Sequence, residues 1–231
     1  SETVLVPIIN QNVNYKPEDV LPVALTGKTP VAFIARADFP GQTLDDLIAV
    51  ARKSPGRLTY GSPGIGTFQH VLAETLKERA GVFMVHIAYR GGQQIVTDVM
   101  GGQIDMAFLP LAGSIPATIK EGKIQGLAVT AKSPHPLFKQ YPAMAAIKGM
   151  EGMDFEIWSG IQVNKNTPDE VVNALNKAFY AAAETPETRN AFEASGNVVL
   201  PSRTPAELTR IYQNEIQRYT GIAKSINLQP Q

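Results

Sequence analysis

The stretch LTYGSPGIGTFQHVLAETLKERAGVFMVHIAY, residues 58–89, decides the fold. It begins with a short strand candidate, Leu58–Tyr60, and continues into a glycine-rich turn at residues 61–66. From Thr67 to about Arg79 apolar residues recur at helical spacing, and Met84–Tyr89 is a second apolar strand candidate. A strand, a turn, a helix and another strand form the repeating unit of parallel α/β sheets.

The same alternation extends along the chain in both directions. Further strands are predicted at residues 30–35, 104–108, 127–130, 155–163 and 198–200, and helices at 44–51, 95–100, 115–120 and onward from Pro168 and Pro205. A stretch rich in proline and glycine separates the strand at 127–130 from the strand at 155–163. The pattern predicts an α/β protein with mostly parallel sheets.

Composition excludes several classes of protein. The 231 residues amount to roughly 1.5 typical domains, with 21 basic and 21 acidic residues and therefore no net charge. A neutral chain has no overall field to attract nucleic acid, which is excluded as a primary partner. The chain contains no cysteine, which excludes disulfides, cysteine-bound metals and thiol catalysis. The sequence has no signal-peptide pattern and no apolar run of the ~18 residues that a membrane span needs.

A glycine-rich loop at the end of the first strand is a candidate ligand site. Ligands of open parallel sheets lie beyond the carboxyl ends of the strands, next to helix N-termini. Gly61, Gly64 and Gly66 allow backbone N–H groups to turn toward one point, and Ser62 and Thr67 add hydroxyl groups. The loop lacks the lysine of a P-loop and the glycine order of a dinucleotide site, so a carboxylate is favoured over a phosphate. The alternative is a tight turn that binds nothing.

A second candidate loop follows the next strand. Tyr89 offers a ring and a hydroxyl group, Arg90 offers a cation, and Gly91 allows a ligand to approach the backbone closely. Each feature alone is also common on protein surfaces. Two such loops on adjacent strands together favour a binding site.

Catalytic and metal-binding patterns are weak. Of the three histidines, His70 is predicted to hydrogen-bond the glycine loop and hold its shape, His86 to lie in the core, and His135 to lie in a proline-rich loop. Their spacing matches no zinc motif, and no G-x-S-x-G nucleophile elbow is present. The sequence therefore predicts no catalytic residue, no metal and no cofactor.

Four motifs in order resemble one known family. They are YGSPGIGTFQH at residues 60–70, VHIAYRG at 85–91, VMGGQIDMAF at 99–108 and IKEGKIQGLAVT at 119–130. Together they resemble the Bug family, the TctC-like periplasmic solute-binding receptors of tripartite tricarboxylate transporters. The resemblance covers nearly the whole chain.

The resemblance implies a periplasmic-binding-protein-like fold of two lobes, a Venus flytrap, that is not an enzyme and needs no cofactor. Such a receptor captures a small carboxylate between its lobes and presents it to the membrane permease subunits of the transporter. Residues 1–32 and 155–231 would form a first lobe without the family's opening β-α-β segment, and residues 33–154 a second lobe. The implied location is the periplasm.

The resemblance also implies which residues bind the ligand. Ser62, Gly64, Gly66 and Thr67 match the family's glycine loop, and Tyr89, Arg90 and Gly91 match its neighbouring strand end. Pro63, Ile65, Phe68 and Gln69 replace residues that are usually small and polar, so Ile65 and Phe68 are expected to make an apolar rim. The rim favours an aromatic or weakly polar carboxylate over aspartate or citrate. Leu109 stands where the family often has Asp or Asn, so one polar contact is expected to be missing.

Two other functions fit the same residues. One is an α/β enzyme that acts on a phosphorylated or carboxylated small molecule with His70 as its base, although no second catalytic group accompanies this histidine. The other is a ligand-sensing module for a membrane partner, which differs from the receptor only in that partner.

Overall fold

The computed structural model describes residues 2–9, 12–132, 138–194 and 197–228. The chain divides into two compact units. The first unit combines Ser1–Thr29 with Ile157–Gln231, and the second unit is Pro30–Glu156. The predicted lobe boundaries fall two or three residues from these divisions, and His135 lies outside the described residues.

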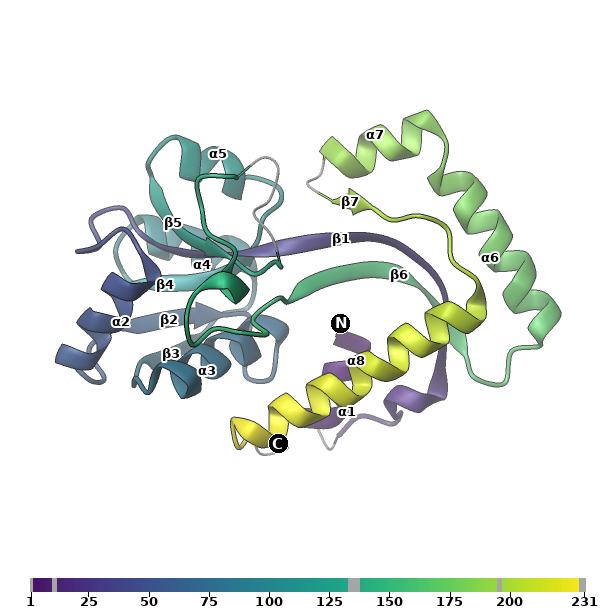
Figure 1. Ribbon diagram of the computed structural model, residues 1–231, viewed down its shortest axis with the longest axis horizontal. Coiled ribbons are helices and arrows are strands. Elements are labelled where there is room, and N and C mark those ends of the chain that lie inside the picture. The colour runs from purple at the N-terminus through teal and green to yellow at the C-terminus, as the bar shows by residue number, and fades with distance from the viewer. Residues whose placement is uncertain (1, 10–11, 133–137, 195–196, 229–231) are drawn as a thin grey trace. The chain divides into compact units, whose positions relative to one another are not determined.

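The second unit is built on a sheet whose strands have the order β3-β2-β4-β1-β5 (Figure 1). β2 pairs in parallel with both β3 and β4, as the alternating pattern predicts. β1 pairs antiparallel with β4 and β5, so the sheet is mixed on that side. The strands are β1 (Val20–Arg36), β2 (Thr59–Ser62), β3 (Val85–Ala88), β4 (Met106–Pro110) and β5 (Ile124–Val129).

β1 is much longer than the predicted strand at residues 30–35. Pro22 and Pro30 suggest breaks, because a proline cannot donate a ladder hydrogen bond. The strand nevertheless continues through Pro30, whose carbonyl accepts a hydrogen bond from the Leu111 N–H at 2.9 Å. A proline is tolerated here because the hydrogen bond to Leu111 uses its carbonyl group and needs no N–H.

Helices connect the strands of the second unit. They are α2 (Leu44–Lys53), α3 (Phe68–Ala80), α4 (Gly92–Met100) and α5 (Ile115–Lys120), all close to their predicted positions. α2 begins with a complete capping box, in which the Thr43 hydroxyl accepts from the Asp46 N–H and the Asp46 carboxylate accepts from the Thr43 N–H. α3 ends at Gly81, whose left-handed backbone (φ 60°) closes the helix.

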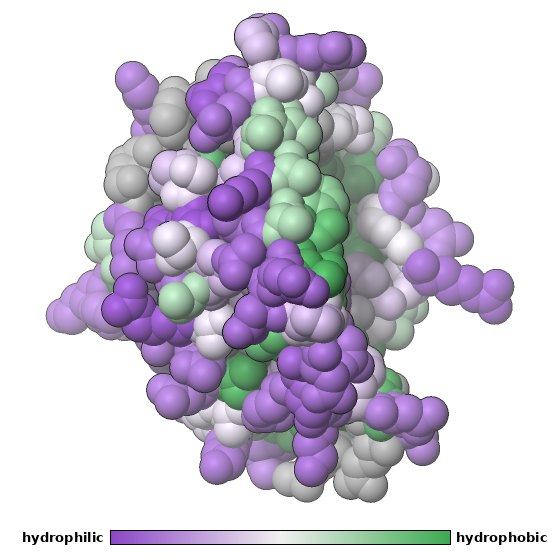
Figure 2. Space-filling view, turned by 90° about the vertical axis from the view of Figure 1, so that its right-hand side faces the viewer, coloured by the Kyte–Doolittle hydropathy of each residue, from purple (hydrophilic) through white to green (hydrophobic). Residues whose placement is uncertain are grey.

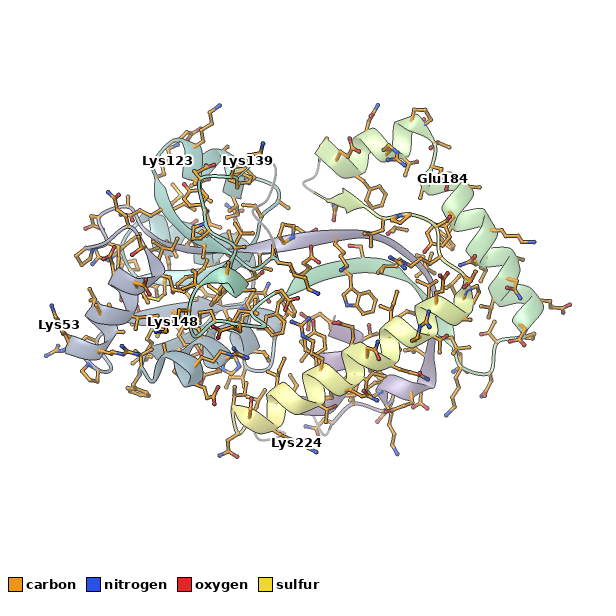
Figure 3. All side chains as sticks on the ribbon, in the orientation of Figure 1. Lys53, Lys123, Lys139, Lys148, Glu184 and Lys224 are labelled. Carbon is orange, nitrogen blue, oxygen red and sulfur yellow. The ribbon has the colours of Figure 1, made fainter. Side chains whose placement is uncertain are left out.

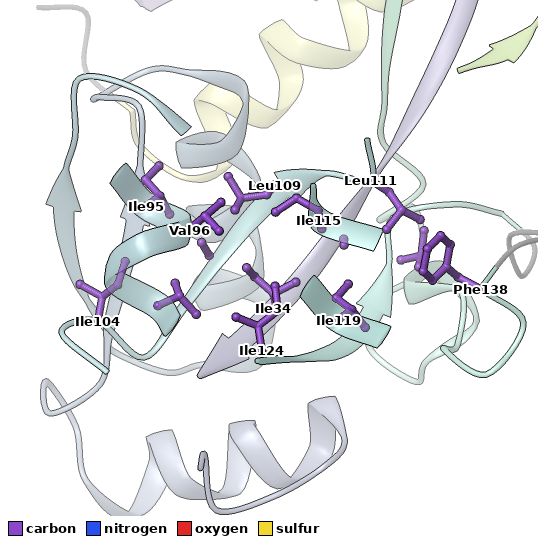
Figure 4. Close-up of a cluster of buried hydrophobic side chains, with 14 residues drawn as sticks. Ile34, Ile95, Val96, Ile104, Leu109, Leu111, Ile115, Ile119, Ile124 and Phe138 are labelled. Atoms are coloured by element: carbon purple, nitrogen blue, oxygen red, sulfur yellow. The ribbon is translucent and has the colours of Figure 1, made fainter. Parts of the chain in front are cut away.

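The core around α4 and α5 fixes this part of the sheet. Figure 4 shows Ile95 and Val96 of α4 and Ile115 and Ile119 of α5 together with Ile34 of β1, and all five are less than 9% exposed. In a core packed this densely, removing a methylene group lowers the stability of the fold. This core supports the sheet from which the loops after β2 and β3 emerge.

The first unit has helices around the first part of β1. It contains α1 (Glu2–Ile9), the 3-10 turn η1 (Pro17–Asp19), α6 (Asp169–Ala183), α7 (Pro186–Ala194) and α8 (Pro205–Ser225), with β6 (Glu156–Asn164) and β7 (Val198–Val199). β6 and β7 both pair with β1. Trp158 of β6 lies edge-on to Tyr212 of α8, with 6.0 Å between the ring centroids.

Two helices of the first unit were not predicted. The β-branched residues of α1 do not favour a helix, but Val4 and Leu5 are fully buried where α1 packs against α8 (Figure 1). Tertiary packing therefore overrides local preference. α7 has no buried residue among its described members, so its sequence carries no clear apolar stripe.

The surface of the first unit has an apolar strip along α6. Figure 2 shows it against mainly polar surroundings. Val171 is 40% exposed, and Ala174, Ala178 and Ala182 follow at helical spacing and are also exposed. This helix face does not pack into the described core of its unit.

Several charged side chains of both units are exposed. Lys53, Lys123 and Lys148 of the second unit and Glu184 and Lys224 of the first are exposed, as the sticks in Figure 3 show. In the described part of the chain, every helix is too short or too polar to cross a lipid bilayer.

Candidate ligand-binding site

The two predicted loops lie side by side in the second unit. β2 and β3 are neighbouring parallel strands, and Ser62 at the end of β2 pairs with Ala88 at the end of β3. The Tyr89 N–H donates to the Ser62 carbonyl at 2.9 Å, which joins the two strand ends. Each strand then leads through its loop into a helix, α3 or α4. Both helix N-termini therefore follow the same edge of the sheet.

The glycine loop has a fixed internal geometry. Gly64 and Gly66 have φ values of 141° and 79°, which residues with a side chain rarely adopt. The Gly64 N–H donates to the Ser62 hydroxyl at 3.2 Å, and the Gly64 carbonyl accepts from the Thr67 hydroxyl at 2.7 Å. The Gly66 N–H donates to His70 Nδ1 at 3.2 Å, which confirms the predicted role of His70 in holding the loop.

The helices that follow these loops lack side-chain caps. Thr43 and Thr204 cap α2 and α8 with complete capping boxes. Thr67 occupies the same position in α3, but its hydroxyl donates to the Gly64 carbonyl and caps nothing. Gly91 at the start of α4 has no side chain to cap with. Both helices thus keep the positive end of their dipole without a side-chain acceptor.

The second loop is held by Tyr89. Its hydroxyl donates to Asp98 Oδ2 at 2.7 Å, so this hydroxyl is already used inside the protein. Burial, followed by the bond to the carboxylate, raises the pKa of Tyr89 to about 12. Arg90 beside it is exposed and forms no ion pair within the described ranges, so its guanidinium is available to an anion.

Two side chains expected to contact a ligand lie in the interior. Ser62 is fully buried and bonds within the loop. Phe68 is 1% exposed and its ring lies edge-on to Phe155, with 6.2 Å between the centroids. The expectation of a rim formed by Phe68 is therefore wrong for its ring, because the first position of α3 points into the core. Ile65, by contrast, is 53% exposed at the loop surface.

Sequence reasoning missed the polar setting of His86. It was expected in an apolar core, yet it is only half-buried and its Nε2 lies 2.6 Å from the Ser62 hydroxyl. The sequence carries no local signal for this contact, because it depends on the pairing that places His86 opposite Tyr60, one residue before the glycine loop begins. Serine beside histidine is the arrangement of a nucleophile and its base, but the buried Ser62 hydroxyl cannot reach a substrate.

Metal binding has no support in the described residues. Among them, His, Asp and Glu side chains do not gather in groups of three or more that could hold an ion.

Comparison with known proteins identifies the family. The sequence model of the tripartite tricarboxylate transporter family receptor, TctC, matches residues 1–228. The chain belongs to this family. Its membership confirms the resemblance, carried by the four motifs, to a family of transporter receptors.

One relative and two solved structures show the extent of the similarity. The UPF0065 protein in the tcbD-tcbE intergenic region of Pseudomonas sp. (strain P51) is 29% identical over 201 residues, which are 87% of this chain. The chain spans 59% of that relative's length. The periplasmic binding protein BugD is 26% identical with a TM-score of 0.87, over 99% of this chain and 77% of BugD. Rpa4515 of R. palustris, solved with adipate, is 24% identical with a TM-score of 0.87, over 100% of this chain and 77% of that one.

These likenesses confirm the predicted periplasmic-binding-protein-like α/β fold. In this TctC-family chain β2 pairs in parallel with β3 and β4, and both candidate loops lie in this part of the sheet. The antiparallel β1 is the part of the sheet that the sequence pattern did not reveal.

A groove elsewhere in the same unit is a poorer candidate for an anion. It is a groove of about 480 Å³ along β5, with Gln42, Thr43, Gln140 and Tyr141 among its polar lining. Among the described residues that line it, none carries a charged side chain. The nearby N-terminus of α2 is already capped by Thr43 and Asp46. The groove therefore offers an anion neither a cation nor an open helix end.

The Tyr89–Asp98 bond gives a first testable prediction. Tyr89→Phe is expected to lower the free energy of unfolding by about 1 to 2 kcal/mol, because the half-buried Asp98 carboxylate loses its donor. Chemical denaturation followed by circular dichroism measures this loss. Tyr141→Phe is the control, since the Tyr141 side chain is half-buried like that of Tyr89, but its hydroxyl has no such bond within the described part of the chain. Equal stability of Tyr89→Phe and wild type would contradict the prediction.

Proposed function

We propose that this TctC-family chain is an extracytoplasmic solute-binding protein that binds a small carboxylate at the two loops of its second unit. It then delivers the ligand to the membrane permease subunits of a tripartite tricarboxylate transporter. The observation that carries the proposal is the pair of helices, α3 and α4, that follow neighbouring parallel strands without a side-chain cap.

The chemistry of the loops favours an anion. Backbone N–H groups at the first turn of α3 and α4 are donors, and the helix dipoles add a positive potential. Arg90 supplies a full positive charge in the second loop, in a geometry suited to a flat carboxylate. Gly64, Gly66, Thr67 and Gly91 shape the backbone. The buried Ser62 hydroxyl holds the loop, and neither it nor the buried Phe68 ring contacts the ligand.

The remaining features set the ligand class and the location. Ile65 is the exposed apolar side chain of the glycine loop, which favours an aromatic or weakly polar body attached to the carboxylate. The location that the family implies is the periplasm, and the partner is a permease and not nucleic acid. The net charge of zero is consistent with a small-molecule ligand as the main partner.

The experiment that tests the function is isothermal titration calorimetry with a panel of carboxylates. Adipate, benzoate, aspartate and citrate are compared with adipamide, which has the shape of adipate without its charge. We expect saturable binding of one or more of the carboxylates with an apolar body, no binding of adipamide and no turnover of the bound compound. A folded protein that binds none of the carboxylates would refute the proposal.

Ile65 gives a second prediction, which concerns selectivity. Ile65→Ser is expected to weaken binding of an aromatic or aliphatic carboxylate about five- to tenfold, because about 1 kcal/mol of apolar contact is lost. Binding of a small polar carboxylate should change little. Phe83→Ser is the matched control, since Phe83 is 59% exposed but lies at the far end of α3, before β3 begins. An unchanged order of affinities in Ile65→Ser would contradict the prediction.

A further inference from the structure

Two histidines lie together beneath the glycine loop. His70 comes from the first turn of α3 and His86 from β3, and their ring centroids are 4.5 Å apart. Tyr60 of β2 stacks on His86 with 4.9 Å between the centroids. Three elements thus place aromatic, titratable side chains under the loop that the proposed function uses.

His70 holds the loop through a lone pair. Gly66 is buried, and its N–H donates to His70 Nδ1 at 3.2 Å. This bond needs an unprotonated Nδ1, because a charged imidazole has a proton on both nitrogens and accepts nothing. A proton on Nδ1 would leave the Gly66 N–H buried without its acceptor and would place two donors against each other.

His86 holds the other end of the loop through Ser62. The Ser62 oxygen lies 2.6 Å from His86 Nε2, accepts from the Gly64 N–H at 3.2 Å and is 3.0 Å from the Gly64 carbonyl. One assignment satisfies every group: Nε2–H donates to Ser62, and the Ser62 hydroxyl donates to the Gly64 carbonyl. The imidazole of His86 thereby orients the hydroxyl that shapes Gly64.

The charged groups around the pair are few and are engaged with each other. Glu74 of α3 accepts from the Tyr60 hydroxyl and from Lys77 Nζ at 2.6 Å, and Lys77 also lies over the Tyr60 ring at 5.5 Å. Burial, and after it the nearby His70, lowers the pKa of His86 to about 4. Burial also lowers the pKa of His70, against the opposing effect of Glu74. Both rings are therefore uncharged at neutral pH.

We propose that His70 and His86 are positioning residues for the ligand. An uncharged His70 and the Nε2–H of His86 hold residues 62–66 in the binding arrangement, and a proton on His70 Nδ1 releases the loop and the carboxylate. The inference rests on the proposed function, since it assigns these residues a role at the same site. It goes beyond that function by making binding depend on two side chains that do not touch the ligand, and on the charge of one of them, His70.

The first test compares binding by variants at neutral pH. His70→Asn places an amide oxygen near the position of Nδ1 and keeps an acceptor that does not titrate, whereas His70→Leu removes it. We expect His70→Leu to weaken binding of the tightest carboxylate of the panel at least tenfold, and His70→Asn to stay within about threefold of wild type. Equal binding by His70→Leu and wild type would overturn the proposal.

The second test is the dependence of binding on pH. Wild type and the double variant His70→Asn/His86→Gln are titrated with the same ligand at each pH, so that protonation of the ligand cancels. As the pH falls from about 6.5 toward 4, wild type should lose affinity at least tenfold relative to the double variant. Parallel curves for the two proteins would overturn the proposal.

The third test needs no ligand and separates this proposal from the proposed function. Nitrogen-15 NMR of the imidazoles and of the Gly64 and Gly66 amides follows the loop as the pH falls. We expect both amide signals of wild type to shift together with protonation of the histidines, and those of the double variant to stay in place. Failure to bind any carboxylate would refute the function, whereas loop amides that ignore histidine protonation would refute the positioning role even if binding is found.

Discussion

A single methyl group added at Gly160 is expected to lower the free energy of unfolding of the first unit by about 2 to 3 kcal/mol. Gly160 lies in β6 and is exposed, which by itself would suggest tolerance. A Cβ atom at this position, however, would lie 2.2 Å from the Ala24 carbonyl oxygen of β1. A backbone atom cannot move aside as a flexible side chain can, so the pairing of β6 with β1 must open.

The prediction is measured by thermal and chemical denaturation of Gly160→Ala. Gly221→Ala is the matched control: it makes the same change in the same unit, inside α8, where a Cβ would meet nothing within 4 Å. The control should gain up to about 1 kcal/mol, because alanine favours a helix more than glycine does. A Gly160→Ala protein as stable as wild type would show that β6 does not approach β1 so closely.

Gly64→Ala is expected to weaken carboxylate binding about 10- to 100-fold. The space around Gly64 is open, since a Cβ would meet only a methyl group of Thr67 at 3.9 Å. The alanine is disfavoured by the backbone torsion at this position, a φ of 141°. A residue with a side chain adopts such a conformation at a cost of about 1 to 3 kcal/mol in conformational free energy. The loop relaxes by changing this torsion, and its bonds to Ser62 and Thr67 are then lost.

The control for this variant lies at the other end of the same helix. Gly81→Ala also places a side chain on a glycine with positive φ, 60°, in open space, so its cost in stability should be comparable. Its affinity for the ligand should equal that of wild type. Calorimetry measures the affinity of both variants. Similar losses of affinity in Gly64→Ala and Gly81→Ala would show that general destabilisation, not loop geometry, controls binding.

The stretch that decides the fold was predictable because local pattern and tertiary structure agree there. Residues 58–89 form β2, the glycine loop, α3 and β3 within one or two residues of expectation. α1 was not predictable, since its β-branched residues become helical only by burial against α8. The full length of β1 was hidden by Pro22 and Pro30, which interrupt the pattern but not the strand.

The candidate site was likewise predictable only in part. Positions of the two loops follow from strand order, so Gly64, Thr67 and Arg90 could be chosen from sequence. Side-chain direction could not, and this is why Phe68 was expected at a rim that its buried ring does not reach. The contact of His86 with Ser62 depends on the register of β2 against β3, which a single sequence does not encode locally.

The edge-on contact between Trp158 and Tyr212 makes the chain its own spectroscopic reporter. Trp158 is the single tryptophan of the sequence and belongs to the first unit. Its fluorescence therefore follows the melting of that unit alone, while circular dichroism follows the helices of both. A difference between the two melting curves would resolve the stabilities of the two units in one unmodified sample, with no label introduced.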